Sequence, residues 1–174
     1  MNFSFDEQAL LKQSAIWNMP SFLETYTFHD SSLYEFRVRS SDDLLVFIGW
    51  DLHWNKAIPS EYNLLVIRFA KHYWAKWREG AWWQPTLDGA TSKVVSQAER
   101  EQMLNDERFD LRAYQNERDD IQAPMMDASL TRTVFDFMNW GECEILHSAE
   151  VSFACFDESG SLGEIPFENK AREK

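Results

Sequence analysis

The sequence of 174 residues has few of the residues on which disulfide-rich, metal-binding or phosphate-binding domains depend. Its six glycines leave little room for a glycine-rich phosphate loop, and no GxSxG motif occurs. The two cysteines are too few for a disulfide framework and lack the spacing of a zinc site. No stretch approaches the about 20 apolar residues of a membrane-spanning helix, and the N-terminus has no secretory signal pattern. We therefore expect a cytoplasmic protein with free thiols.

Basic side chains are also scarce. The formal net charge is −12, and residues 97–174 carry 18 acidic against 8 basic side chains. Nucleic acids and anionic membranes are polyanions, so this balance argues against both as partners. It favours a basic protein partner, although acidity also serves solubility alone.

Aromatic residues, in contrast, are abundant, with eight Trp and thirteen Phe. Six of the tryptophans fall between Trp50 and Trp83. The adjacent pair Trp82 and Trp83 lies in a segment rich in glycine and proline, where complete burial is difficult. Because tryptophan is enriched at binding hot spots, this pair is either a flank of the core or an exposed anchor for a partner.

The hydrophobic pattern predicts one α+β domain spanning residues 1–174, with a mostly antiparallel sheet of five to six strands. Residues 6–17 suit an amphipathic helix that ends before Pro20. The first strand group covers 33–70, with strands expected at 33–39, 44–54 and 64–70. Residues 71–78 are left open between strand and helix, and residues 78–93 are expected to form a loop. Helices are expected to cover one face of the sheet.

The second half of the chain predicts a helical insertion followed by more strands. Ser96 and Glu99 have the spacing of a capping box at the start of a charged, helix-prone segment, residues 96–120. The second strand group covers 131–156 and is expected to hold two or three strands.

The tripeptide His29-Asp30-Ser31 directly precedes the first expected strand. In one interpretation it forms a turn, in which Asp30 or Ser31 accepts backbone N–H groups and His29 donates to a carbonyl. In the alternative, a small metal-dependent hydrolase, its metal ligands are His29, Asp30, Asp51 and His53. No HExxH or related spacing accompanies these residues. The turn is therefore favoured, and no metal, cofactor or catalytic residue is predicted.

A strongly acidic segment provides the candidate partner-binding residues. Its carboxylates are interspersed with four arginines, so it is either a solvated helix face or an acidic surface for a cationic groove. Together with Trp82 and Trp83, the predicted partner-binding residues are Glu99, Glu101, Asp106, Glu107, Asp110, Glu117, Asp119 and Asp120.

The order of features from Phe28 to Phe69 resembles a known family. It runs as HDS, strand, turn, strand ending in an acidic residue, gap and strand, and GECEILHSAEVSFACFD resembles the closing strands. The pattern spans roughly residues 22–160 and is similar to bacterial HDS-motif domains catalogued among immunity proteins of polymorphic toxin systems, Imm50-like in particular. The insertion at 96–120 and the Trp-rich loop depart from it. The resemblance implies a cytoplasmic protein that neutralises a cognate toxin, without catalytic residues.

These observations together favour a non-enzymatic, acidic immunity or inhibitor protein. It is expected to block a basic toxin domain, such as a nuclease, by steric occlusion and charge complementarity. The alternatives are the metal-dependent hydrolase and a structural interaction domain. The oligomeric state and the partner's identity are left open by the sequence.

Overall fold

The computed structural model describes residues 15–40, 43–77, 85–105, 127–138 and 141–166, which form ten strands and two helices. The strands are β1 Ala15–Trp17, β2 Ser32–Val38, β3 Leu44–Gly49, β4 Leu64–Phe69, β5 His72–Trp77, β6 Leu87–Val94, β7 Thr131–Phe137, β8 Gly141–His147, β9 Val151–Phe156 and β10 Leu162–Gly163. The helices are α2 Met19–Thr25 and α3 Gln97–Asn105.

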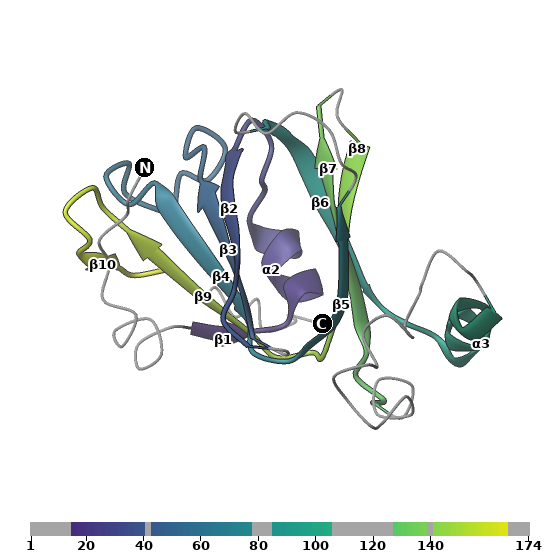
Figure 1. Ribbon diagram of the computed structural model, residues 1–174. Helices are drawn as coiled ribbons and strands as arrows, with labels where there is room; N and C mark the ends of the chain where they lie inside the picture. Colours follow the sequence, from purple (N-terminus) through teal and green to yellow (C-terminus); the bar gives the residue numbers. More distant parts are fainter. Residues whose placement is uncertain (1–14, 41–42, 78–84, 106–126, 139–140, 167–174) are drawn as a thin grey trace, which may run out of the picture.

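The strands form two antiparallel sheets (Figure 1). Sheet A has the order β1-β9-β4-β3-β2, with β10 also paired to β9, and sheet B has the order β5-β8-β7-β6. The prediction of helices with mostly antiparallel strands is thus confirmed. The single sheet of five to six strands is replaced by two sheets that face each other.

Two chain segments pass from one sheet to the other. β4 continues into β5 through residues 70–71, and β8 continues into β9 through residues 148–150. Because β4 pairs with β9 and β5 pairs with β8, the two crossings lie side by side. This arrangement forms the first junction between the sheets, at a corner where strands change sheet.

The HDS tripeptide forms a second junction. The backbone N–H of Asp30 donates to the carbonyl oxygen of Leu87 over 3.0 Å, and the N–H of Leu87 donates to the carbonyl oxygen of Ser31 over 2.7 Å. Ser32 and Thr86 form an isolated β-bridge next to them. These bonds connect the start of β2 in sheet A with the start of β6 in sheet B.

The main core lies between the two sheets. β3 is buried on both of its faces, with Leu44, Val46 and Ile48 in the main core and Leu45 and Phe47 in a second cluster. This explains its continuous apolar sequence, which lacks the alternation of a half-exposed strand. Sheet B supplies the other wall of the main core, through Leu87, Phe135, Cys143 and Ile145.

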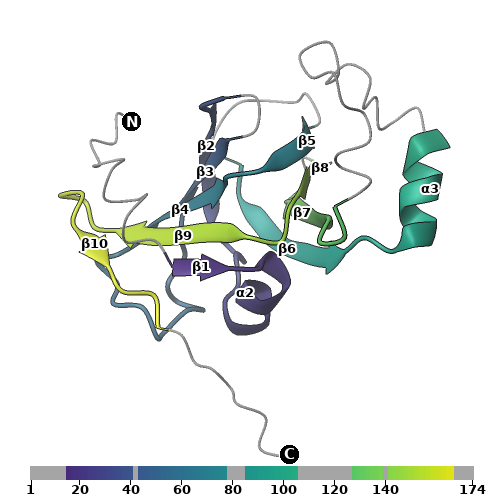
Figure 2. The same ribbon diagram turned by 90° about the horizontal axis from the view of Figure 1, so that it is seen from below.

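Helix α2 lies between the two sheets and follows directly after β1 (Figures 1 and 2). The side-chain oxygen of Asn18 caps the helix by accepting the N–H of Ser21 over 2.8 Å. Pro20 stands in the first turn, where the N–H that proline lacks has no helical partner. Met19 and Phe22 are buried in the main core. The helix therefore closes the gap that the two sheets leave between them.

The predicted helix over 6–17 is wrong for residues 15–17, which form β1 and pair with β9. Residues 6–14 lie outside the described ranges. Pro20 begins a helix instead of following one. Pairing with a buried strand outweighs a local helical pattern here, since helix propensity is a weak local preference.

Other element boundaries can also be compared with the predictions. Residues 87–94 form β6, although 87–93 were expected as loop, and Gly89 marks an irregularity of register and not a chain break. β3 ends at Gly49, so residues 50–54 belong to a loop. β5 occupies 72–77, within the range left open. In the second strand group, residues 148–150 separate β8 from β9 at the junction between sheets.

Helix α3 begins with the predicted capping box. The carboxylate of Glu99 accepts the N–H of Ser96 over 2.9 Å, and the hydroxyl of Ser96 accepts the N–H of Glu99 over 3.3 Å. Arg100 is buried and donates to the carbonyl oxygens of Val95, Asp127 and Ala128, which fixes the helix against the end of sheet B. Residues 106–120 of the predicted insertion lie outside the described ranges.

Candidate functional site

The candidate site lies at the end of the molecule that carries the HDS tripeptide, which we call the HDS end. Here β2 begins, β3 ends and β4 begins, as the pairing of Ser32 with Gly49 and of Gly49 with Leu64 shows. β6 also begins here, β7 ends and β8 begins, since Leu87 pairs with Phe137 and Phe137 with Gly141. These strand ends lie at the top of Figure 1. The HDS end thus brings together loops from both sheets.

The HDS tripeptide itself is a tight turn. His29 and Asp30 are its central residues, and Asp30 has a φ of 61°, which aspartate tolerates better than most residues. The N–H of Ser31 donates to the carbonyl oxygen of Phe28 over 3.0 Å. The buried Ser31 hydroxyl accepts the N–H of Asp51 over 3.0 Å. The turn therefore also holds the loop after β3.

That loop, residues 50–63, is fixed by a buried asparagine. The side-chain oxygen of Asn55 accepts the N–H of Thr27 over 2.9 Å, and its NH₂ group donates to the carbonyl oxygens of Thr27 and Asp51, each over 2.9 Å. The indole N–H of Trp50 also donates to the Thr27 carbonyl over 2.9 Å. The side chains of two loop residues thus bind the backbone of Thr27, directly before the HDS turn.

Trp54 stands out of this loop into solvent, with 51% of its surface exposed. Its indole N–H donates to Oδ2 of Asp30 over 3.1 Å. The rings of His29 and His53 pack against it edge to face, with centroids 5.3 Å and 5.1 Å away. An exposed indole with these contacts is a fixed surface feature and not a free side chain.

Three carboxylates, those of Asp30, Asp51 and Asp88, lie near His29 and affect its charge. Nδ1 of His29 lies 3.0 Å from the carbonyl oxygen of Asp88, so Nδ1 carries the proton. This hydrogen bond is the main reason that the pKa of His29 is raised, and the charges of Asp30, Asp88 and Asp51 raise it further. On the neighbouring strands, burial and the charges of Glu142 and Asp88 raise the pKa of Asp136. The HDS end is therefore electronegative.

An open pocket of about 550 Å³ lies between the ends of β2 and β3 and the loop 50–63, and two of its lining residues, Asp30 and His53, contact the Trp54 ring. Tyr34 is at the irregularity in the β2–β3 register, and its ring lies over Gly49. A Cβ atom on Gly49 would lie 2.2 Å from the Tyr34 hydroxyl oxygen, so only glycine allows this contact without a shift. The pocket walls are Asp30, Tyr34, Gly49, Trp50, Asp51, Leu52, His53, Ile58, Ser60 and Asn63.

The four residues of the metal-dependent alternative lie at the HDS end but do not converge. His53 reaches Asp51 through its backbone N–H, over 2.7 Å, while its ring packs on Trp54. Within the ranges that the structure describes, no group of three or more His, Cys, Asp or Glu side chains is placed to hold a metal ion.

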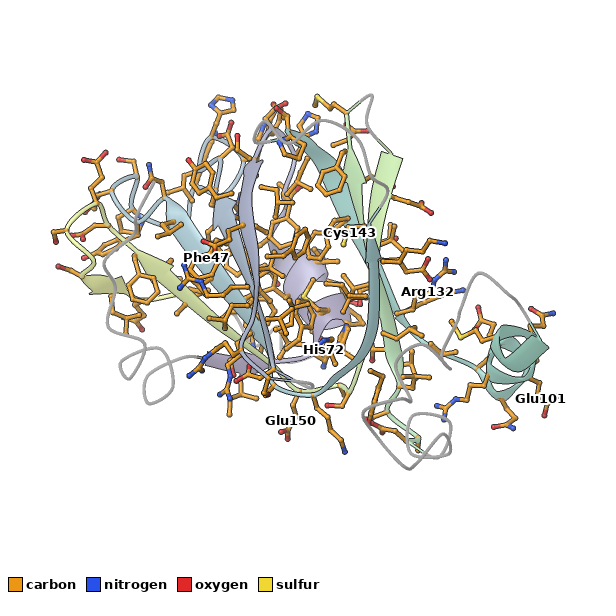
Figure 3. The ribbon with its side chains drawn as sticks, in the orientation of Figure 1. Phe47, His72, Glu101, Arg132, Cys143 and Glu150 are labelled. Carbon is orange, nitrogen blue, oxygen red and sulfur yellow. The ribbon has the colours of Figure 1, made fainter. Side chains whose placement is uncertain are left out.

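Only Glu99 and Glu101 of the predicted partner-binding residues are described. Glu99 is engaged within the protein by Lys93 and Ser96, which lower the pKa of its carboxyl to about 2. Glu101 is exposed on α3, where it accepts from the side chain of Gln97 over 3.2 Å (Figure 3). Trp82, Trp83, Asp106, Glu107, Asp110, Glu117, Asp119 and Asp120 lie outside the described ranges.

Three residues of the site were not singled out from the sequence: Trp54, as a residue distinct from the other tryptophans, Asn55 and Asp88. The signal available was the run Asp51-Leu-His-Trp-Asn55, which combines turn-forming and aromatic residues directly after a buried strand. Asp88 had no such signal, because β6 was expected to be loop.

Comparisons with protein-family models, with curated proteins and with solved structures find no match for this chain. Among the described residues, no helix is long and apolar enough to cross a membrane.

Replacing Ser31 by alanine is expected to lower the free energy of unfolding by about 1–2 kcal/mol, because the N–H of Asp51 loses its buried acceptor. Urea denaturation of the two proteins measures this difference. Ser32→Ala is the matched control, since the Ser32 hydroxyl has no hydrogen-bond partner within the described ranges. Equal losses in both variants would show that the Ser31 hydroxyl does not hold the loop.

Proposed function

We propose that this chain is a non-enzymatic, acidic binding protein that inhibits a basic protein partner, such as a toxin domain with a cationic active-site cleft. It acts by covering the cleft and matching its charge. The HDS end is the docking face. The acidic segment after α3 and the pair Trp82 and Trp83 extend this proposal to surfaces outside the described ranges.

The observation that carries the proposal is the exposed Trp54 within an electronegative surface. Tryptophan is the residue most enriched at the energetic centres of protein interfaces. Among the described residues of loops 27–31 and 50–63, the start of β6, the end of β7 and the start of β8, there is one lysine, Lys56, and there are six carboxylates, namely Asp30, Asp51, Glu61, Asp88, Asp136 and Glu142. An apolar anchor surrounded by negative charge suits a partner whose own surface is basic.

The rigidity of the face supports the same function. Asn55 and Ser31 hold the loop 50–63 in place, and Asp30 holds the Trp54 ring. Binding therefore needs little ordering of the loop, and most of the interaction energy appears as affinity. Negative charge placed this way also accelerates the encounter with a cationic partner.

The test begins with capture of binding proteins from the host by the tagged chain, followed by kinetics on the purified pair. We expect a basic partner whose association rate constant falls about 10-fold or more between low and high salt. We expect Trp54→Ala to weaken binding by about 2 kcal/mol, or roughly 30-fold. Co-expression is expected to relieve the growth inhibition that the captured partner causes alone.

Glu150→Gln is the matched control, because Glu150 is an exposed carboxylate at the end of the two sheets opposite the HDS end (Figure 3). It removes one negative charge and is expected to leave the affinity within about twofold of the original. An association rate that is independent of salt, or a Trp54→Ala variant with full affinity, would contradict docking through the HDS end.

A further inference from the structure

The pocket beside Trp54 has the chemistry of a receptor for one cationic side chain. Asp30 and Asp51 are among its lining residues, and none of its described lining residues is lysine or arginine. Asp51 accepts one hydrogen bond, from the N–H of His53, and Asp30 accepts one from Trp54. Within the described ranges, each carboxylate therefore keeps an oxygen that receives no hydrogen bond.

Both carboxylates are already positioned. The backbone of Asp51 is tied to the HDS turn by the Ser31 hydroxyl, and its side chain caps the turn at His53. Asp30 is fixed by its left-handed backbone conformation and by the indole of Trp54. Both acidic residues of the pocket are thus held in place, and preorganised acceptors are the condition under which charge-assisted hydrogen bonds add most to affinity.

We propose that this pocket binds the guanidinium group of an arginine side chain presented by the partner protein. This inference takes from the proposed function only that the partner is a protein. The chemistry of the pocket is argued from its lining residues. A planar guanidinium has five donors and can bond two separate carboxylates at once, whereas an ammonium is a compact point charge. Leu52 and Ile58 give the aliphatic part of the side chain an apolar wall.

The experiment uses the purified full chain and blocked tripeptides as probes: Gly-Arg-Gly, Gly-Lys-Gly and the neutral Gly-citrulline-Gly. The readout is the NMR signal of the Trp54 indole N–H, which is hydrogen-bonded to the pocket residue Asp30. We expect the arginine peptide to shift this signal saturably. The lysine peptide is expected to bind about fivefold or more weakly, and the citrulline peptide about 10-fold or more weakly.

Two conservative variants locate the binding site. Asp51→Asn and Asp30→Asn keep the side-chain shape and are each expected to weaken the arginine peptide about 10-fold, since each removes one charge-assisted bond. Glu150→Gln is expected to leave binding unchanged. The amide spectrum of each variant reports whether it remains folded. Gly49→Ala changes the pocket wall while both carboxylates stay in place. It displaces the Tyr34 ring and is expected to alter the affinity for the arginine peptide.

The results separate this inference from the proposed function. Lysine binding as tight as arginine binding, or arginine binding that is insensitive to Asp51→Asn, would overturn the arginine pocket. No peptide binding together with capture of a basic partner would also overturn it, while the proposed function stands. Peptide binding without any basic partner would leave the pocket intact and remove the proposed function.

Discussion

Replacing Phe22 by alanine is expected to lower the free energy of unfolding by about 3–5 kcal/mol. Phe22 is completely buried, and its ring stacks on Phe153 with centroids 4.0 Å apart and planes 4° apart. The rings of Phe28 and Trp50 lie at 5.8 Å and 5.9 Å. Alanine would leave a cavity among these rings, because their backbones belong to different elements and cannot collapse together.

The size of this effect also reflects the helix that carries Phe22. A helix of seven residues has little stability of its own and depends on tertiary packing. Loss of the ring therefore weakens both the core and the element that closes the gap between the sheets. Urea denaturation followed by circular dichroism measures the difference.

Glu24→Ala, at an exposed position of the same helix, is the control and is expected to change stability by about 0.5 kcal/mol or less. Phe22→Leu is expected to fall between the two, because it keeps part of the buried volume. A Phe22→Ala loss no greater than that of Glu24→Ala would show that α2 contributes little to the core.

The strands of sheet A that lie near each other in sequence could be predicted from local patterns. The continuous apolar run of β3 and the alternation before it place a hairpin over residues 32–49, as observed. The division into two sheets could not be predicted in this way. The crossings at 70–71 and 148–150 are only two and three residues long, and they depend on β4–β5 and β8–β9 bending together.

The candidate site shows the same limit. The HDS turn could be predicted because Asp and Ser before a strand are typical turn residues. Its meeting with Trp54 and Asp88 depends on the second junction between the sheets, which joins residues far apart in the sequence. β6 forms that junction, and Gly89 near its start favoured a loop on local grounds. The sequence thus predicted the HDS turn but not the residues from other elements that contact it.

A buried polar row crosses sheet B and leads to the second large prediction. Nδ1 of His147 lies 2.6 Å from the carbonyl oxygen of Ser148, which can only accept, so Nδ1 carries the proton. Nε2 then accepts from the Thr133 hydroxyl over 2.8 Å, and Thr133 accepts from Ser92 over 2.8 Å. His147 and Thr133 have no exposed surface. This is the arrangement for a neutral His147; a proton on Nε2 would require both hydroxyls to turn, so that Thr133 accepts from the ring and donates to Ser92.

The pKa of His147 is lowered to about 4, mainly by burial and to a lesser extent by the charge of His72, its partner on β5, while the Ser148 carbonyl opposes the shift. Above the ordinary value of 6.5, His147 is neutral in both the folded and the unfolded chain and adds no pH dependence. Below it, the unfolded chain takes up a proton that the folded protein refuses. Stability therefore decreases as the pH falls from 6.5 to about 4, by up to about 3 kcal/mol.

Urea denaturation at several pH values measures this decrease, and His147→Gln isolates it. The variant lacks the titrating ring, so we expect it to lose about 3 kcal/mol less than the original protein across that interval, even if it is less stable at neutral pH. His29 acts in the opposite direction, because its pKa is raised, but it is common to both proteins and cancels in the comparison. Stability curves that run parallel for the two proteins would contradict a neutral, buried His147. So would NMR signals of the His147 ring that titrate near the ordinary pKa.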